Sequence, residues 1–141
     1  MPTKLPAHLR HAYEQAVYCI NVANSAQGEL EVRIGQHSAG VDKLLEQHAV
    51  ASAAFITACN PASELLNDDD NAVRHAALYA DVQAAVYKCL QGEGRDPGGT
   101  CPAERSLLIL GIEHAAAAKL SQHCGQSAWV WLVSGCPAEL V

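Results

Sequence analysis

One apolar stretch that ends abruptly constrains this chain more than any other part of its sequence. Residues 53–59, Ala-Ala-Phe-Ile-Thr-Ala-Cys, are small, β-branched or aromatic, which is typical of a fully buried strand. Asn60 and Pro61 follow directly, and a proline cannot donate to a strand ladder and restricts the residue before it. The sequence therefore predicts a buried strand that ends in a polar loop reaching to Ser63. Loops at the edge of a core often carry functional side chains.

Composition and charge narrow the classes of protein. Half of the 141 residues are apolar, which predicts a single globular domain over residues 1–141. The net charge of −6 disfavours partners such as nucleic acid or an anionic membrane surface, which both need clustered positive charge. Residues 1–12 do not resemble a signal peptide, and no apolar run approaches the roughly eighteen residues of a membrane span. We therefore expect a cytoplasmic protein.

The six cysteines have no C-x-x-C spacing, and in a cytoplasmic chain we expect them to be reduced. Cys59 and Cys101 fall in loops or at strand ends, so either is a nucleophile if a base lies nearby and an inert thiol if none does. The seven histidines form no H-x-x-x-H pattern, so we expect no metal site and no cofactor. A calcium loop at residues 67–71 lacks the required glycine and distal glutamate.

The first half of the chain predicts a helix over about 7–17, then two strands over 18–22 and 29–34 that pair as a hairpin. A short helix over 41–48 leads into the buried strand. We expect this strand and strand 29–34 to form a parallel pair joined by a right-handed crossover.

The second half of the chain begins with a long helix that runs from an acidic N-terminal cap at 67–71 to about Leu90. One face of this helix is rich in alanine, which predicts close packing against the sheet; its members are Val73, Ala76, Ala77, Ala80, Ala84 and Tyr87. Residues 92–102 hold four glycines and two prolines and predict a loop, either a flexible connection or an anion cradle.

A buried strand over 106–112 follows, then an alanine-rich helix over 113–123 that ends at Gly125. The last predicted strand covers 127–133, with Trp129 and Trp131 on one face. Helices and strands interleave along the chain, so the predicted fold class is α+β, a mixed sheet of about five strands covered by about four helices.

Polar side chains gather where strands end and helices begin. Each has an ordinary reading as a cap, turn or surface residue, yet together they would line one cleft beside the sheet. The set consists of Arg33, Gln36, Asn60, Ser63, Asn71, Arg74, Glu104, Ser106 and Gln126.

Several short motifs of these stretches resemble a bacterial family of uncharacterised proteins, domain-of-unknown-function family 3293. The motifs are residues 33–36 (RIGQ), 54–63 (AFITACNPAS), 70–74 (DNAVR), 92–97 (GEGRDP), 102–106 (PAERS) and 125–128 (GQSA). The resemblance runs from about Tyr13 to the C-terminus and implies no known reaction. At the positions of Cys59 and Cys101 the family pattern resembles an aromatic residue and a tryptophan, which implies a changed pocket if those rings stack on a ligand.

Two functions remain open from the sequence. In the first, Arg33 and Arg74 hold a small anionic ligand such as a nucleotide, Asn60, Gln36 and Gln126 orient it, and Glu104 is the catalytic acid or base. In the second, the chain is a non-catalytic interaction module or homo-oligomer, and exposed aromatic residues carry the binding.

Overall fold

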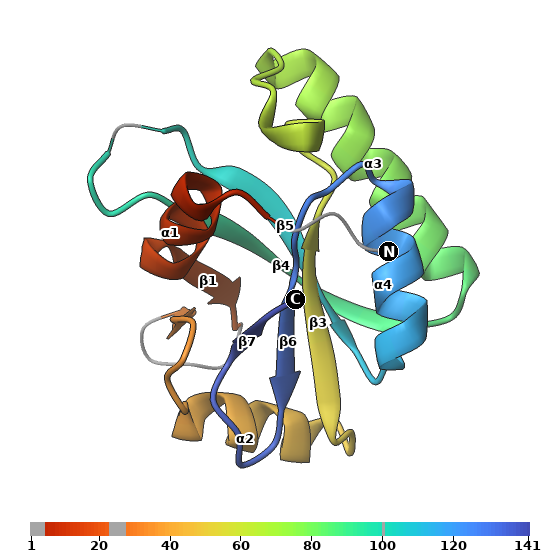
Figure 1. Ribbon diagram of the computed structural model, residues 1–141. Helices are drawn as coiled ribbons and strands as arrows, with labels where there is room; N and C mark the ends of the chain where they lie inside the picture. The colour runs from red at the N-terminus through yellow and green to blue at the C-terminus, as the bar shows by residue number, and fades with distance from the viewer. Residues whose placement is uncertain (1–4, 23–27, 100) are drawn as a thin grey trace.

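The computed structural model describes residues 5–22, 28–99 and 101–141. Its described part forms four α-helices, a single 3₁₀ turn and seven strands (Figure 1). In chain order these are α1 (Ala7–Gln15), β1 (Val17–Asn21), β2 (Glu29–Val32), α2 (Ala39–Gln47), β3 (Ser52–Thr57), η1 (Pro61–Ser63), α3 (Asp68–Ala84), β4 (Lys88–Arg95), β5 (Glu104–Leu110), α4 (His114–His123), β6 (Val130–Val133) and β7 (Glu139–Leu140).

The seven strands form one sheet in the order β2-β1-β4-β5-β3-β6-β7, and every pair of neighbouring strands is antiparallel. The sheet curls into a half-barrel whose two ends meet, because a parallel bridge joins Ile34, just after β2, to Ala138, just before β7. The predicted α+β class and the hairpin of β1 and β2 are confirmed.

Alternation along the strands gives the sheet two buried faces. The inner face packs Tyr18, Phe55 and Leu108 together with Leu45 of α2. The outer face buries Ile56, Leu107 and Ile109 under α3 and α4, which lie on the same side of the sheet (Figure 1). Both faces of β3 and β5 are therefore buried, and this explains why their sequences are continuously apolar.

The predicted parallel pair is wrong. β2 and β3 are separated in the sheet by β1, β4 and β5, so no crossover joins neighbouring strands. The helix between them, α2, instead places Val41, Leu44 and Leu45 in the inner core. A strand–helix–strand sequence is compatible with a parallel pair of neighbouring strands and with two strands that lie apart in the sheet. Here the apolar face of α2 is buried inside the half-barrel, which is consistent with the second arrangement.

Residues 92–95 were expected in a loop and lie in a strand instead. β4 continues to Arg95, and with β7 it raises the strand number from about five to seven. Gly92 and Gly94 face inward beside Phe55 and Tyr18, whose rings meet edge to face at 5.5 Å between centroids. A Cβ on Gly92 would collide with the carbonyl oxygen of Cys19, so glycine here permits close strand contact rather than a turn.

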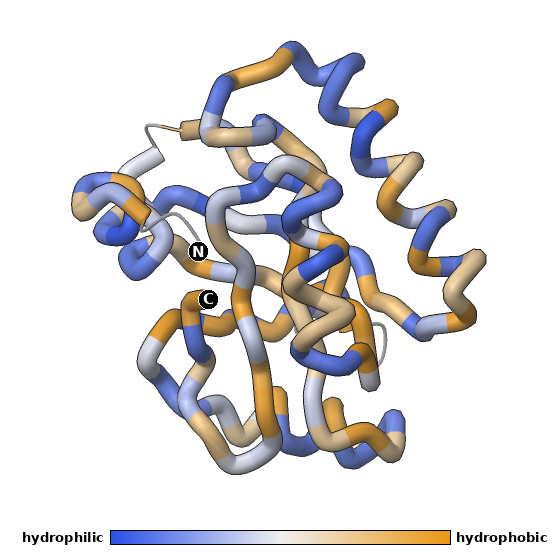
Figure 2. The backbone as a smooth tube through the Cα atoms, turned by 45° about the vertical axis from the view of Figure 1, so that its right-hand side comes forward, coloured by the Kyte–Doolittle hydropathy of each residue, from blue (hydrophilic) through white to orange (hydrophobic). Residues whose placement is uncertain are grey.

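The buried face of α3 is also not the predicted one. The helix ends at Ala84 and buries His75, Leu78 and Val82, whereas Val73 is 69 % exposed. Figure 2 shows apolar segments of α3 at the outside of the molecule. The exposed positions include Ala76, Ala77, Ala80 and Ala84. Alanine contributes little area in either environment, so it could not define the face, and the larger Leu78 and Val82 decide it.

Candidate functional site

The loop after β3 adopts an unusual backbone. Asn60, Ala62 and Ser63 have φ values of 48°, 55° and 62°, in the left-handed region that glycine normally occupies. Such conformations each cost of the order of 1–3 kcal/mol and persist only where surrounding contacts fix them. One such contact is the hydrogen bond from the Ala62 amide to the Gly125 carbonyl at 2.8 Å.

A reciprocal pair of asparagines joins this loop to α3. The Asn60 amide donates to Asn71 Oδ1 at 3.0 Å, and Asn71 Nδ2 donates to Asn60 Oδ1 at 2.9 Å. The same Asn60 oxygen accepts from the Leu66 amide, so only the Nδ2 group of Asn60 is free to point elsewhere. It donates to Oε2 of Glu104 at 2.8 Å, which fixes the orientation of that carboxyl group.

Glu104 begins β5 directly opposite Gly94, on the inner side of the strand near one mouth of the half-barrel. Burial raises the pKa of its carboxyl group, and the hydrogen bond from Asn60 offsets only part of this effect. A carboxyl group in this environment holds its proton to a higher pH than an exposed one, which is a common property of catalytic acids.

Two tyrosines complete the cluster. Tyr18, opposite Gly94 on β1, donates its hydroxyl to the carbonyl of Tyr13 at 2.7 Å. Burial raises the pKa of both phenols; a hydrogen bond with Ser63 partly offsets it for Tyr13, and the charge of Glu104 raises both further. We define the mouth cluster as Tyr13, Tyr18, Asn60, Ser63 and Glu104.

Arg74 and Gln126 hold the backbone around the mouth cluster. Arg74 donates from Nε to the Ala58 carbonyl at 2.6 Å and from Nη2 to the Cys124 carbonyl at 2.7 Å. Gln126 donates from Nε2 to the carbonyl of Cys59 at 2.9 Å. These bonds tie the end of β3 and the end of α4 to α3, so Nε and Nη2 of Arg74 are already engaged with backbone carbonyl groups.

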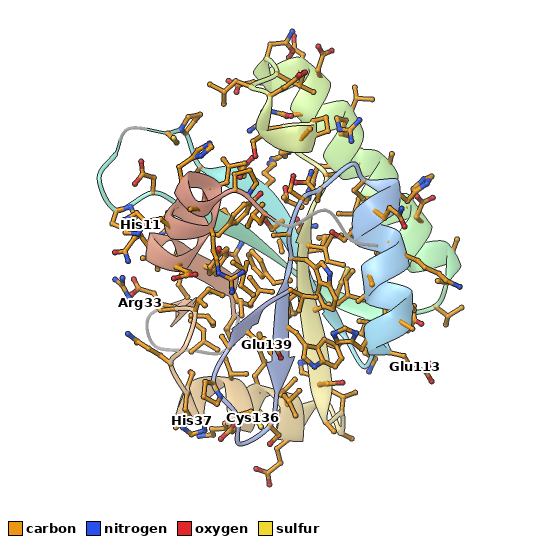
Figure 3. All side chains as sticks on the ribbon, in the orientation of Figure 1. His11, Arg33, His37, Glu113, Cys136 and Glu139 are labelled. Carbon is orange, nitrogen blue, oxygen red and sulfur yellow. The ribbon has the colours of Figure 1, made fainter. Side chains whose placement is uncertain are left out.

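The structure does not bring Arg33 and Gln36 into the mouth cluster. Arg33 is exposed and is labelled at the margin of the molecule in Figure 3. Its charge is not among the causes of the raised pKa of Glu104, Tyr13 or Tyr18. Gln36 bonds through its backbone to Arg33 and Ala138. Ser106 is buried, and its hydroxyl donates to the carbonyl of Glu104 at 3.1 Å. Four residues of the predicted set therefore lie together, namely Asn60, Ser63, Asn71 and Glu104. Arg74, Ser106 and Gln126 support them, and Arg33 and Gln36 are remote.

The cysteines are unpaired, and all six lie in the described part of the chain. Burial raises the pKa of the Cys59 thiol, which donates to the carbonyl of Arg105 at 3.5 Å, so its environment favours an inert thiol over a nucleophile. Cys101 is exposed. No group of three or more His, Cys, Asp or Glu side chains within the described residues has the geometry to hold a metal ion.

Tyr13 and Tyr18 are the two members of the mouth cluster that the sequence did not predict. The predicted helix over 7–17 contains Tyr13 and the predicted strand over 18–22 begins at Tyr18, and both assignments of secondary structure hold. What the pattern does not show is that the charge of Glu104, at the start of β5, acts on both phenols. Two tyrosines five residues apart across a helix–strand junction are the only signal that the sequence offers.

A family model described as a protein of unknown function, DUF3293, matches residues 56–129, which is more than half of the chain. The chain belongs to this family. The part that matches DUF3293 begins inside β3 and includes Asn60, Asn71, Arg74, Glu104 and Gln126, whereas Arg33, Gln36 and both tyrosines of the mouth cluster lie before it.

The comparisons with curated proteins and with solved structures find no match. No helix among the described residues has the length and apolar character needed to span a bilayer. The arrangement of the side chains is therefore the basis for any function assigned to this DUF3293 chain.

Proposed function

We propose that this protein binds a small polar molecule at the mouth cluster and that Glu104 serves as proton donor or acceptor towards it. The observation that supports this proposal is the partly buried carboxyl group of Glu104, held by Asn60 and flanked by the hydroxyls of Tyr13 and Tyr18. A fold that needed only stability would gain nothing from a carboxyl group whose charge is disfavoured by its surroundings.

The charges favour a ligand without net negative charge. The anionic ligand or nucleotide expected from the sequence depended on Arg33 and Arg74, but the first is remote and the second is bound to two carbonyl groups. Glu104 is then the charged side chain of the mouth cluster, and an ionised carboxylate repels an anion. We therefore expect hydroxyl or amide groups of a neutral ligand to bind to Glu104, Asn60 and the two phenols.

A thermal-shift screen with matched pairs tests this proposal. The probes are adenosine with AMP and glucose with glucose 6-phosphate, added to the wild type and to Glu104→Gln. We expect an uncharged member to raise the melting temperature more than its phosphate, as mass action requires of a ligand that binds the native state. Glu104→Gln should abolish the shift, and Glu113→Gln, an exposed glutamate at the start of α4, should leave it intact. A shift from the phosphorylated members alone, or one unchanged in Glu104→Gln, would contradict the proposal.

The exposed face of α3 supports a second candidate, a homo-oligomer. Val73 is 69 % exposed, and Ala76, Ala77 and Ala80 follow it on the same exposed side, where small side chains allow two helices to approach closely. In an antiparallel pair of α3 helices, the three aspartates of one first turn would lie near Lys88, just beyond the other helix. Sedimentation analysis of the wild type and Ala80→Glu tests this candidate: a dimer lost in the variant supports it, and a monomeric wild type rejects it.

A further inference from the structure

The outer face of the sheet carries a second polar site, separate from the mouth cluster. Six residues of α3, β1, β4 and β5 line a groove with a volume of about 420 Å³. Small-ligand sites usually have volumes of roughly 300–1,000 Å³, so this groove accommodates a small metabolite. We define the outer groove by its lining residues, Asn21, His75, Gln91, Gly92, Glu93 and Arg105.

A buried histidine orients one side of the outer groove. His75 is 6 % exposed, and its Nε2 atom lies 2.8 Å from Oε1 of Gln91. Because that bond occupies the Gln91 oxygen, the amide nitrogen of Gln91 is directed away from His75 with two N–H groups to donate. The Nδ1 atom of His75 is buried and has no hydrogen-bond partner among the described residues. A polar side chain buried in this way is costly for stability, which indicates a positioning role.

Opposite charges line the outer groove without pairing with each other. Glu93 and Arg105 are direct partners in the β4–β5 register, so their side chains leave the same face of the sheet. Glu93 nevertheless turns to Arg95, which contacts its Oε1 atom at 2.7 Å and also binds Glu29. Within the described part of the chain, the guanidinium of Arg105 has no ion pair, whereas Glu93 and Glu29 share the single guanidinium of Arg95 and together keep an excess negative charge.

We infer that the outer groove binds a zwitterion of the free amino acid type. Arg105 and the amide N–H groups of Gln91 match a carboxylate, and Arg is the side chain best suited to hold one. Glu93 Oε2 and the side-chain oxygen of Asn21 match an ammonium group on the other side. A ligand with a single charge would leave one of these groups unmatched, whereas an α-amino acid presents both charges a few ångströms apart.

Calorimetric titration of the full chain with the common free L-amino acids tests this inference. We expect at least one to bind, and its N-acetyl and carboxamide derivatives to bind at least about tenfold more weakly, because each lacks one of the two charges. Arg105→Gln and Gln91→Glu should each reduce the affinity by about tenfold or more. The control is Arg33→Gln, another exposed arginine, which should bind like the wild type.

Two results would overturn the inference: none of the amino acids binding, or binding that Arg105→Gln and Gln91→Glu leave unchanged. Both substituted side chains are exposed, so the variants should fold, and near-ultraviolet circular dichroism checks this directly. The Glu104→Gln variant separates the two sites. It should bind the amino acid normally even if the mouth cluster has no ligand.

Discussion

Replacing Arg74 by alanine should destabilise the protein without any involvement of Glu104. Arg74 donates two short, charge-assisted hydrogen bonds, at 2.6 Å to the Ala58 carbonyl and at 2.7 Å to the Cys124 carbonyl. Bonds from a charged group contribute about 1.5–3 kcal/mol each. Arg74 is only half-buried, so water replaces part of this contribution. Gln126 also remains 3.4 Å from the Cys124 oxygen. We therefore expect a loss of about 2–4 kcal/mol in the free energy of unfolding.

Urea unfolding followed by the fluorescence of the buried Trp129 measures this loss. Arg74→Ala, Glu104→Ala and the double variant complete a cycle in which the two effects should add to within about 0.5 kcal/mol, because no ion pair joins the two side chains. Arg33→Ala is the matched control and should change stability by less than about 0.5 kcal/mol. A loss below about 1 kcal/mol for Arg74→Ala would refute the tethering role. A double variant no worse than either single variant would instead reveal an ion pair with Glu104.

Three further predictions test the fold and the cluster. Gly92→Ala should lower the free energy of unfolding, measured in urea, by about 1–3 kcal/mol or more, because its Cβ would collide with backbone. Gly94→Ala should lower it clearly less, because its Cβ makes only ordinary contacts of 3.8 Å. Equal losses would contradict the strand packing. Cys101 and Cys136 should react with a thiol reagent in the native protein and all six cysteines after denaturation without reductant, so a blocked thiol would disprove the reduced state. The folded protein holds the Glu104 proton more tightly than the unfolded chain, so the free energy of unfolding should fall as pH rises from the unfolded pKa through the folded one. Glu104→Gln should remove this fall. Parallel pH profiles of the wild type and the variant would refute the prediction.

Local signals in the sequence were reliable where one interaction decides the structure. Asn67 caps α3 by accepting from the Asp70 amide, as the acidic stretch predicted, and Gly125 has the positive φ of 73° expected after a helix end. The hairpin of β1 and β2 follows from strict alternation in residues 29–34. In each case the side chains that produce the pattern are neighbours in the chain.

The errors arose where partners distant in the chain decide the structure. Gly92 predicts a loop in the sequence, but in the structure Phe55 and Cys19 lie against it and it belongs to a strand. The alanines of α3 predict the buried face, but Leu78 forms that face instead. The candidate site shows the same limit. Its asparagines and Glu104 were identified from their positions at element ends, but no local pattern shows that Arg74 already binds two carbonyl groups.

The bridge between Ile34 and Ala138 also has a consequence for how the chain folds during its synthesis. These two residues are 104 positions apart (138 − 34), and at about 5–20 residues per second the second follows the first by roughly 5–20 s. During that time one side of the inner core is exposed, and the outer edge of β2 has no strand to pair with. Glu29, Glu31 and Arg33 place charges along this edge, which discourages pairing with another nascent chain until β7 arrives.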